Sequence, residues 1–249
     1  MLSSLYYTIL YQPLLNLLVW FYNVIPGYDV GLAIIAITLL LRILLHPLNR
    51  KSLQQQKVMR ELQPKLEELK SRYKNDRQKL GLETMALYRQ QKVNPFASCL
   101  PLLIQLPILI AAYNVFRIGV TNGSLDGLYS FVRDPGTIDT ISLGLIDWSK
   151  SRTVPGLALA LVSAVLQFFQ MKMMVHKKLP QLPSGEAPTS AKDENIMTEM
   201  NKQMLYLMPA MTVIIGYSVP SGLVLYWFVT TLLSFWQQSR MMKERPLEK

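Results

Sequence analysis

The stretch VGLAIIAITLLLRILL, residues 30–45, decides the fold class of this chain. Thr38 and Arg42 are its polar side chains, and no proline interrupts it. A helix that crosses the hydrocarbon core of a bilayer needs about 20 predominantly apolar residues. Together with its flanks the stretch approaches this length, so the sequence predicts a first membrane span over residues 30–46.

Three more apolar blocks extend the same interpretation, at residues 96–117, 154–175 and 204–236. The last block is too long for a single span. It is interrupted by GYSVPSG, residues 216–222, where glycine and proline indicate a tight turn. We therefore interpret it as a hairpin of two short spans. The predicted fold class is an all-α polytopic membrane protein with five transmembrane helices.

The first 29 residues allow two interpretations. The block from Leu5 to Ile25 is long enough to cross a membrane, but it is rich in tyrosine and tryptophan and contains Gln12, Asn16 and Asn23. Aromatic residues of this kind favour the membrane interface. We predict that residues 1–29 form an interfacial helix on the outer face, and a further span stays open as the alternative.

The formal net charge of +10 on 249 residues raises the possibility of a nucleic-acid partner. The distribution of this charge favours a membrane protein and no specific nucleic acid. Half of the residues are apolar, and the basic residues gather between the apolar blocks. Residues 47–95 hold twelve Lys and Arg, whereas residues 1–29 hold none. Since basic loops stay in the cytoplasm, the N-terminus is predicted outside and the C-terminus inside.

The same rule assigns the remaining segments. Residues 118–153 form an extracytoplasmic loop, residues 176–203 a cytoplasmic loop and residues 237–249 a cytoplasmic tail. Within the basic segment 47–95 we predict a cytoplasmic helical hairpin, with one helix from about Pro64 to Lys74 and a second from about Arg77 to Gln91. The hairpin is either a solvated connector or a docking surface for a ribosome, a targeting factor or anionic lipid.

Polar side chains inside the spans are the candidate functional residues. A charged group at the centre of a span costs about 2.5–3.5 kcal/mol on insertion scales. Arg42 lies four residues before His46, about 6 Å of helix rise, so its guanidinium could reach the interface by snorkelling. The alternative is a water-filled cavity. Gln105 favours that cavity, as do Gln167 and Gln170, which share a helix face. The five firm spans contain no Asp or Glu.

The sequence contains no constellation typical of catalysis. Its single cysteine, Cys99, excludes an internal disulfide, and the two histidines lie far from it and from each other. No nucleophile–His–acid set, metal-ligand cluster or phosphate-binding loop is present in the pattern. We therefore predict that the chain is not an enzyme and binds no cofactor or metal.

Three stretches carry a family resemblance. They are LLLRILLHPLNRKS (39–52), LQPKLEELKSRYKNDRQKLGLETMALYRQQKVNPFASCLPLLIQLPI (62–108) and PSGLVLYWFVTTLLSFWQQ (220–238). In this order they resemble the YidC family of membrane protein insertases. The resemblance implies a bundle of five helices around a hydrophilic groove that is open to cytoplasm and lipid and closed on the outer side. Compared with some members, the chain is expected to lack a large periplasmic domain and a long basic tail.

The resemblance also implies site residues. Arg42 matches the groove arginine, Trp227 matches the aromatic position of the fifth span with Tyr226 beside it, and Gln170 matches the glutamine of the third span, with Gln167 as the alternative. The implied client-binding groove comprises Arg42, Gln105, Gln167, Gln170, Tyr226 and Trp227.

The expected function is that of an insertase or chaperone of the bacterial cytoplasmic (inner) membrane. It would move nascent membrane proteins into the bilayer, alone or with the Sec translocase. Expected partners are nascent membrane proteins, a ribosome, a targeting factor, the Sec translocase and membrane lipids. A small-solute transporter or channel is the alternative, but it predicts inverted repeats, which the two halves do not show. An assembly scaffold that holds clients without inserting them stays open.

Overall fold

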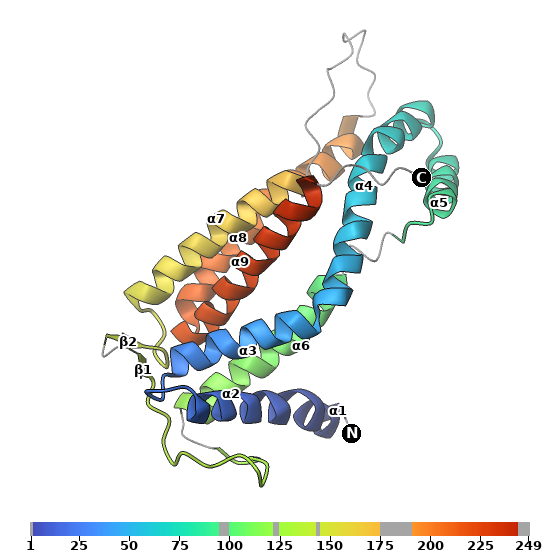
Figure 1. The fold of residues 1–249 in the computed structure, drawn as a ribbon. Helices are drawn as coiled ribbons and strands as arrows, with labels where there is room; N and C mark the ends of the chain where they lie inside the picture. The colour runs from blue at the N-terminus through green and yellow to red at the C-terminus, as the bar shows by residue number, and fades with distance from the viewer. Residues whose placement is uncertain (1, 95–99, 122–124, 143–144, 175–190, 244–249) are drawn as a thin grey trace.

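The computed structural model describes residues 2–94, 100–121, 125–142, 145–174 and 191–243 (Figure 1). The start of the predicted second span, with Cys99, and parts of the predicted loop 176–203 and tail 237–249 lie outside these residues. The elements are α1 (Leu2–Tyr6), the π-helix η1 (Tyr7–Tyr11), α2 (Gln12–Val24), α3 (Val30–Leu44), α4 (His46–Arg72), α5 (Arg77–Gln90), α6 (Leu100–Asn114), the π-helix η3 (Val115–Thr121), β1 (Ile141–Ser142), β2 (Ile146–Asp147), α7 (Val154–Met174), α8 (Ala191–Ser218) and α9 (Ser221–Lys243).

The described chain is mostly helical, and its apolar helices fall where the apolar blocks lie. Two helical stretches are long and apolar enough to cross a membrane, at Leu103–Val120 and Val154–Met173. The pair α3 and α4, bent by 64°, passes the same test as one broken span, and Leu205–Ser218 is a shorter apolar helix. Length and composition thus identify two spans among the described residues, or three with the bent pair.

Helix α4 corrects one expectation. The helix predicted to start near Pro64 begins instead at His46 and carries Pro64 in its interior. Pro47 occupies the first turn, where the missing N–H of proline costs nothing. The intervening residues are rich in Gln, Lys, Arg and Glu, which form solvated helices readily without a broad apolar face. Residues 46–72 of the basic segment therefore form one long helix, which begins directly after the bend at the end of α3.

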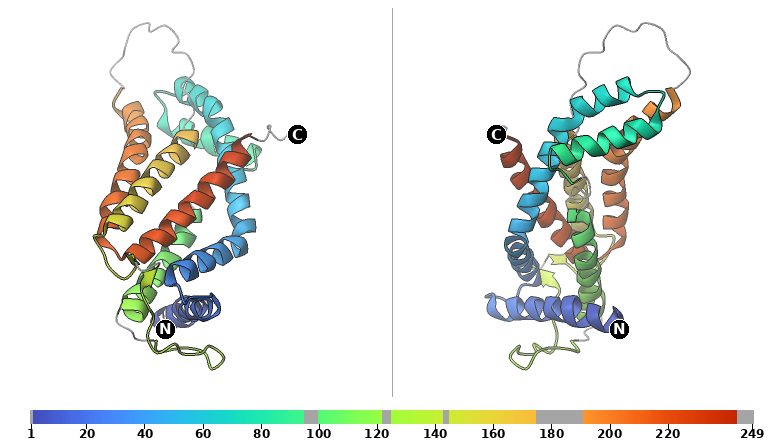
Figure 2. Two further views of the ribbon diagram at one scale, coloured as in Figure 1. Left: turned by 60° about the vertical axis from the view of Figure 1, so that its left-hand side comes forward. Right: turned by 90° about the vertical axis from the view of Figure 1, so that its right-hand side faces the viewer.

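The hairpin of α4 and α5 projects from one end of the molecule, while α1 and α2 lie across the opposite end (Figures 1 and 2). Asp76 caps α5, since its carboxylate accepts a hydrogen bond of 3.0 Å from the Lys79 amide. This cap coincides with the turn expected between the two helices. Helices α7, α8 and α9 lie side by side, and α9 packs in turn on α3.

Polar side chains of α2 form hydrogen bonds with residues 127–133, which belong to the loop between η3 and β1. The Asn16 side chain donates to the Gly127 carbonyl (3.0 Å) and accepts from the Tyr129 amide (2.7 Å). Asn23 donates to the Arg133 carbonyl at 2.6 Å. The residues that interrupt the apolar pattern of α2 thus fasten the loop, whereas Leu15, Leu18 and Val19 on the same helix enter the main hydrophobic core.

Candidate functional site

Arg42 lies in the last turn of α3 and reaches across to α9. Its Nη2 atom donates to the Thr230 carbonyl at 2.6 Å and to the Ser234 hydroxyl at 2.5 Å. Both acceptors are neutral. Among the residues that the structure describes, Arg42 forms no ion pair, and no partner is present for its Nε and Nη1 donors. A guanidinium has five N–H groups, so this side chain keeps unused donors in a partly buried position.

A second polar contact lies beside Arg42. Gln105 of α6 donates to the Tyr226 hydroxyl of α9 at 2.8 Å. Tyr226 is 5% exposed, so its hydroxyl needs this partner. Because Tyr226, Thr230 and Ser234 follow one another at four-residue spacing, they line one face of α9. We call the set formed by Arg42, Gln105, Tyr226, Thr230 and Ser234 the polar cluster.

The other expected groove residues lie outside the polar cluster. Gln167 of α7 accepts a hydrogen bond of 2.6 Å from the Thr212 hydroxyl of α8. Gln170 contributes its backbone carbonyl, which accepts from Gln238 at 3.4 Å. Trp227 is half-buried and follows Tyr226, which turns it to another side of α9. The structure therefore joins Arg42, Gln105 and Tyr226, and it gives the two α7 glutamines separate partners.

Thr230 and Ser234 belong to the polar cluster although the expected groove did not include them. The four-residue spacing from Tyr226 could have identified them, since it places all three on one face. The residues around Thr230 do not indicate its contact with Arg42, because the two residues are 188 positions apart in the sequence.

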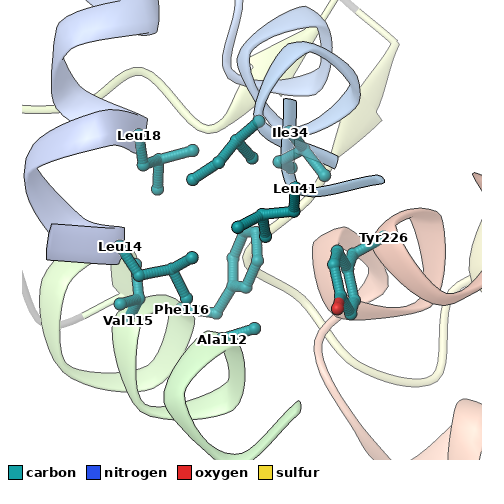
Figure 3. Close-up of a pocket in the computed structure, with 9 residues that line it drawn as sticks. Leu14, Leu18, Ile34, Leu41, Ala112, Val115, Phe116 and Tyr226 are labelled. Atoms are coloured by element: carbon teal, nitrogen blue, oxygen red, sulfur yellow. The ribbon is translucent and has the colours of Figure 1, made fainter. Parts of the chain in front are cut away.

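An apolar layer covers the polar cluster on the side of α2. Leu14, Ile34 and Phe116 surround a cavity of about 20 Å³ that Tyr226 also lines (Figure 3). This volume would hold about one water molecule, but a cavity with apolar walls stays dry. The layer therefore separates the polar cluster from the end of the molecule where α2 lies.

The same end carries a hydrogen-bonded closure around Trp148. Its indole Nε1 donates to the Ser142 hydroxyl at 2.6 Å, and that hydroxyl donates to Asp29 at 2.6 Å. Gly31 permits this approach, since a Cβ there would lie 2.6 Å from the indole nitrogen. The Trp148 carbonyl also accepts from the Gly222 amide at 2.9 Å. The hairpin formed by β1 and β2 is thus fixed between the start of α3 and the start of α9.

Asp147 makes this closure sensitive to acid. Burial raises the pKa of its carboxyl, but surrounding hydrogen-bond donors outweigh that effect and lower the pKa from 3.8 to about 2. The donors are Ser149, Lys150 and Thr140. A carboxyl with a lowered pKa stabilises the fold above its ordinary pKa and loses this contribution as pH falls toward the folded value.

We therefore expect Asp147→Asn to reduce the dependence of the free energy of unfolding on pH in the acidic range. The stability of the wild-type protein should fall more steeply than that of the variant between about pH 4 and pH 2. Tryptophan fluorescence during unfolding at several pH values measures the difference. Parallel curves for the two proteins would contradict the assignment.

These features identify a class of protein. They describe a multi-pass helical membrane protein whose interior carries a cationic, hydrogen-bonding cluster closed at one end. The chain belongs to the 60Kd inner membrane protein family, whose model matches residues 20–248. It is accordingly a multi-pass protein of the inner (cytoplasmic) membrane.

Several relatives in this family are named membrane protein insertase YidC. The protein of Fusobacterium nucleatum subsp. nucleatum is 33% identical, over 94% of this chain and 98% of its own length. The proteins of Anaeromyxobacter sp. (strain Fw109-5) and Syntrophobacter fumaroxidans are 38% and 33% identical over 94% of this chain. The chain spans only 36% and 38% of those two relatives, respectively.

Proposed function

We propose that this chain inserts nascent membrane proteins into the bilayer, with the polar cluster as the place where a polar client segment is received. The relatives carry the name of membrane protein insertase. The observation that carries the proposal is the guanidinium of Arg42, which keeps unused donors between apolar helices. Insertases of this family are not enzymes, and the chain is accordingly not an enzyme.

The proposed mechanism is a reduction in the cost of desolvation. Moving an unpaired polar group into hydrocarbon costs several kcal/mol, which stops the polar end of a client at the membrane. Free N–H groups of Arg42 can bind carbonyl or carboxylate oxygens of that segment. The apolar segment of the client then enters lipid, which provides the driving force. Gln167 and Gln170 on α7 would extend the polar path from their positions outside the cluster.

The proposal includes five spans and a defined orientation. Helix α3, the α6–η3 stretch, α7, α8 and α9 would cross the membrane, and α1 to α2 would lie along its outer face. The basic residues of α4 and α5 support a cytoplasmic hairpin. Leu82 and Met85 of that hairpin, three residues apart on α5, are 72% and 47% exposed, and this apolar pair supports a docking surface for a ribosome, targeting factor or Sec translocase.

Cysteine labelling tests the orientation. In a Cys99→Ser background, we expect Ser130→Cys to react with a membrane-impermeant maleimide on intact cells. Ser71→Cys in α4 should react only after permeabilisation. Both side chains are exposed, and the hairpin of α4 and α5 lies at the opposite end of the molecule from the loop of residues 125–142 (Figure 1). The reverse labelling pattern would contradict the proposed topology.

Reconstitution tests the function. Vesicles that contain only the purified chain should make a single-span client resistant to extraction and should protect its outer segment from protease. A scaffold that only holds clients would bind the client without protecting that segment. A solute channel would instead release a small dye from the vesicles. The apolar layer and the Trp148 closure argue against such a channel, because they interrupt a continuous polar path.

A further inference from the structure

A second feature lies on the far side of α7 from the polar cluster. A furrow of about 600 Å³ runs between α7 and α8, and all of its lining side chains are apolar. Six apolar residues of α7 between Leu161 and Phe169 form one wall, and Pro209, Ala210 and Val213 of α8 form the other. Val165, in the middle of the α7 wall, is 54% exposed. The furrow is therefore open to the surroundings of the bundle.

The sequence explains why the two helices leave this space. Near the Trp148 closure they touch, since a Cβ on Gly216 would lie 2.9 Å from that of Ala160. Farther along, Ala164 and Ala210 contribute only methyl groups to the facing walls. Pro209 also removes an N–H from the interior of α8 and so disturbs its regular course.

The chemistry of the furrow indicates its occupant. Walls made only of apolar side chains match an extended hydrocarbon chain. Helix α7 is apolar and long enough to cross a membrane, which places lipid hydrocarbon beside the furrow.

One end of the furrow offers a charge. Lys172 is exposed and lies four residues after Phe168, so it continues the α7 wall by one turn on the same face. Tyr206 of α8 lies at this end too, with its ring 5.9 Å from that of Phe168 and 63% of its surface exposed. Tyrosine is typical of the level where hydrocarbon meets headgroups. Lys172 forms no ion pair with any residue that the structure describes.

We propose that this furrow binds an anionic phospholipid, with an acyl chain between α7 and α8 and the phosphate at Lys172. The apolar walls fix the chain, and the ammonium group selects the headgroup. This goes beyond client insertion, because neither the furrow nor Lys172 belongs to the polar cluster. In the proposed topology the lipid belongs to the cytoplasmic leaflet.

Native mass spectrometry of the full-length protein tests this inference. Palmitoyl-oleoyl phosphatidylglycerol and phosphatidylcholine are added in equal amounts. We expect the wild type to retain the anionic lipid about fivefold better, the effect of about one basic residue near a headgroup. Lys172→Gln should abolish the preference, while Lys65→Gln, which removes the same charge from α4 outside the furrow, should keep it. Equal retention of both lipids by the wild type would overturn the anionic assignment.

A furrow variant tests the place of binding. Ala210→Leu fills the furrow from an exposed position, so folding should be preserved, and we expect the tightly held lipid to be lost. Ala158→Leu adds the same volume to an exposed position of α7 outside the furrow and should retain it. A photoreactive residue at Val165, in vesicles that contain 30% phosphatidylglycerol, should form adducts with that lipid. Retention by Ala210→Leu, or adducts mainly with a client protein, would overturn the proposal.

Discussion

Arg42→Ala is expected to lower the insertion of a single-span client with an acidic outer segment by about ten- to hundredfold. The physical reason is that a hydrogen bond to a charged group contributes about 1.5–3 kcal/mol, which corresponds to this range of rates. Alanine removes the donors that are free to receive the client and leaves Thr230 and Ser234 unable to replace them. Protease protection of the client in reconstituted vesicles measures the effect.

Two comparisons make the Arg42 result specific. Arg42→Lys keeps the charge and should retain most of the activity, although it loses the forked geometry of the guanidinium. Arg50→Ala removes an exposed arginine from α4 and should have little effect. A client with an uncharged outer segment should depend less on Arg42 than the acidic client. Full activity of Arg42→Ala with the acidic client would show that insertion does not require the charge of Arg42.

Trp148→Ala is expected to produce the largest loss of stability, about 3–5 kcal/mol, which is typical of removing a large buried aromatic side chain. Trp148 is 6% exposed and holds Ser142, Asp29 and the start of α9 in one arrangement. Its removal leaves a cavity and takes away one of the donors to the Ser142 hydroxyl. Thermal unfolding of the detergent-solubilised protein should show a strongly lowered midpoint.

Trp236→Ala is the matched control. Trp236 is also a tryptophan, but it is 51% exposed and contacts the Arg240 guanidinium at 4.1 Å from its ring centre. We expect a change within about 1 kcal/mol, since a cation–π contact at an exposed site contributes little. Equal destabilisation by the two substitutions would show that the Trp148 closure is not a stabilising unit.

The apolar helices could be predicted because their signal is local. The predicted ranges 30–46 and 154–175 lie within two residues of α3 and α7 at each end. The start of α4 could not be placed from its apolar pattern, since solvated helix formers fill the stretch before Pro64. The predicted start of the second hairpin helix at Arg77 is confirmed, because Asp76 caps this helix through its own side chain.

The candidate site was predictable in its residue types but not in its pairings. Arg42, Gln105 and Tyr226 stand out as polar groups in apolar surroundings, which a sequence reveals. Their partners depend on how α3, α6 and α9 pack, and nothing local marks the Thr230 carbonyl as an acceptor for Arg42. The same holds for Ser142, whose hydroxyl connects Asp29 to Trp148 across more than a hundred residues.

The bend after α3 gives the long helix of the hairpin the properties of a lever. Leu45 is the pivot, only three residues from Arg42, and the 27 residues of α4 extend about 40 Å from it. With an arm of that length, a 5 Å displacement of the tip corresponds to a rotation of only about 7° at the pivot. A partner that tilts α4 would therefore act next to the turn that carries the guanidinium.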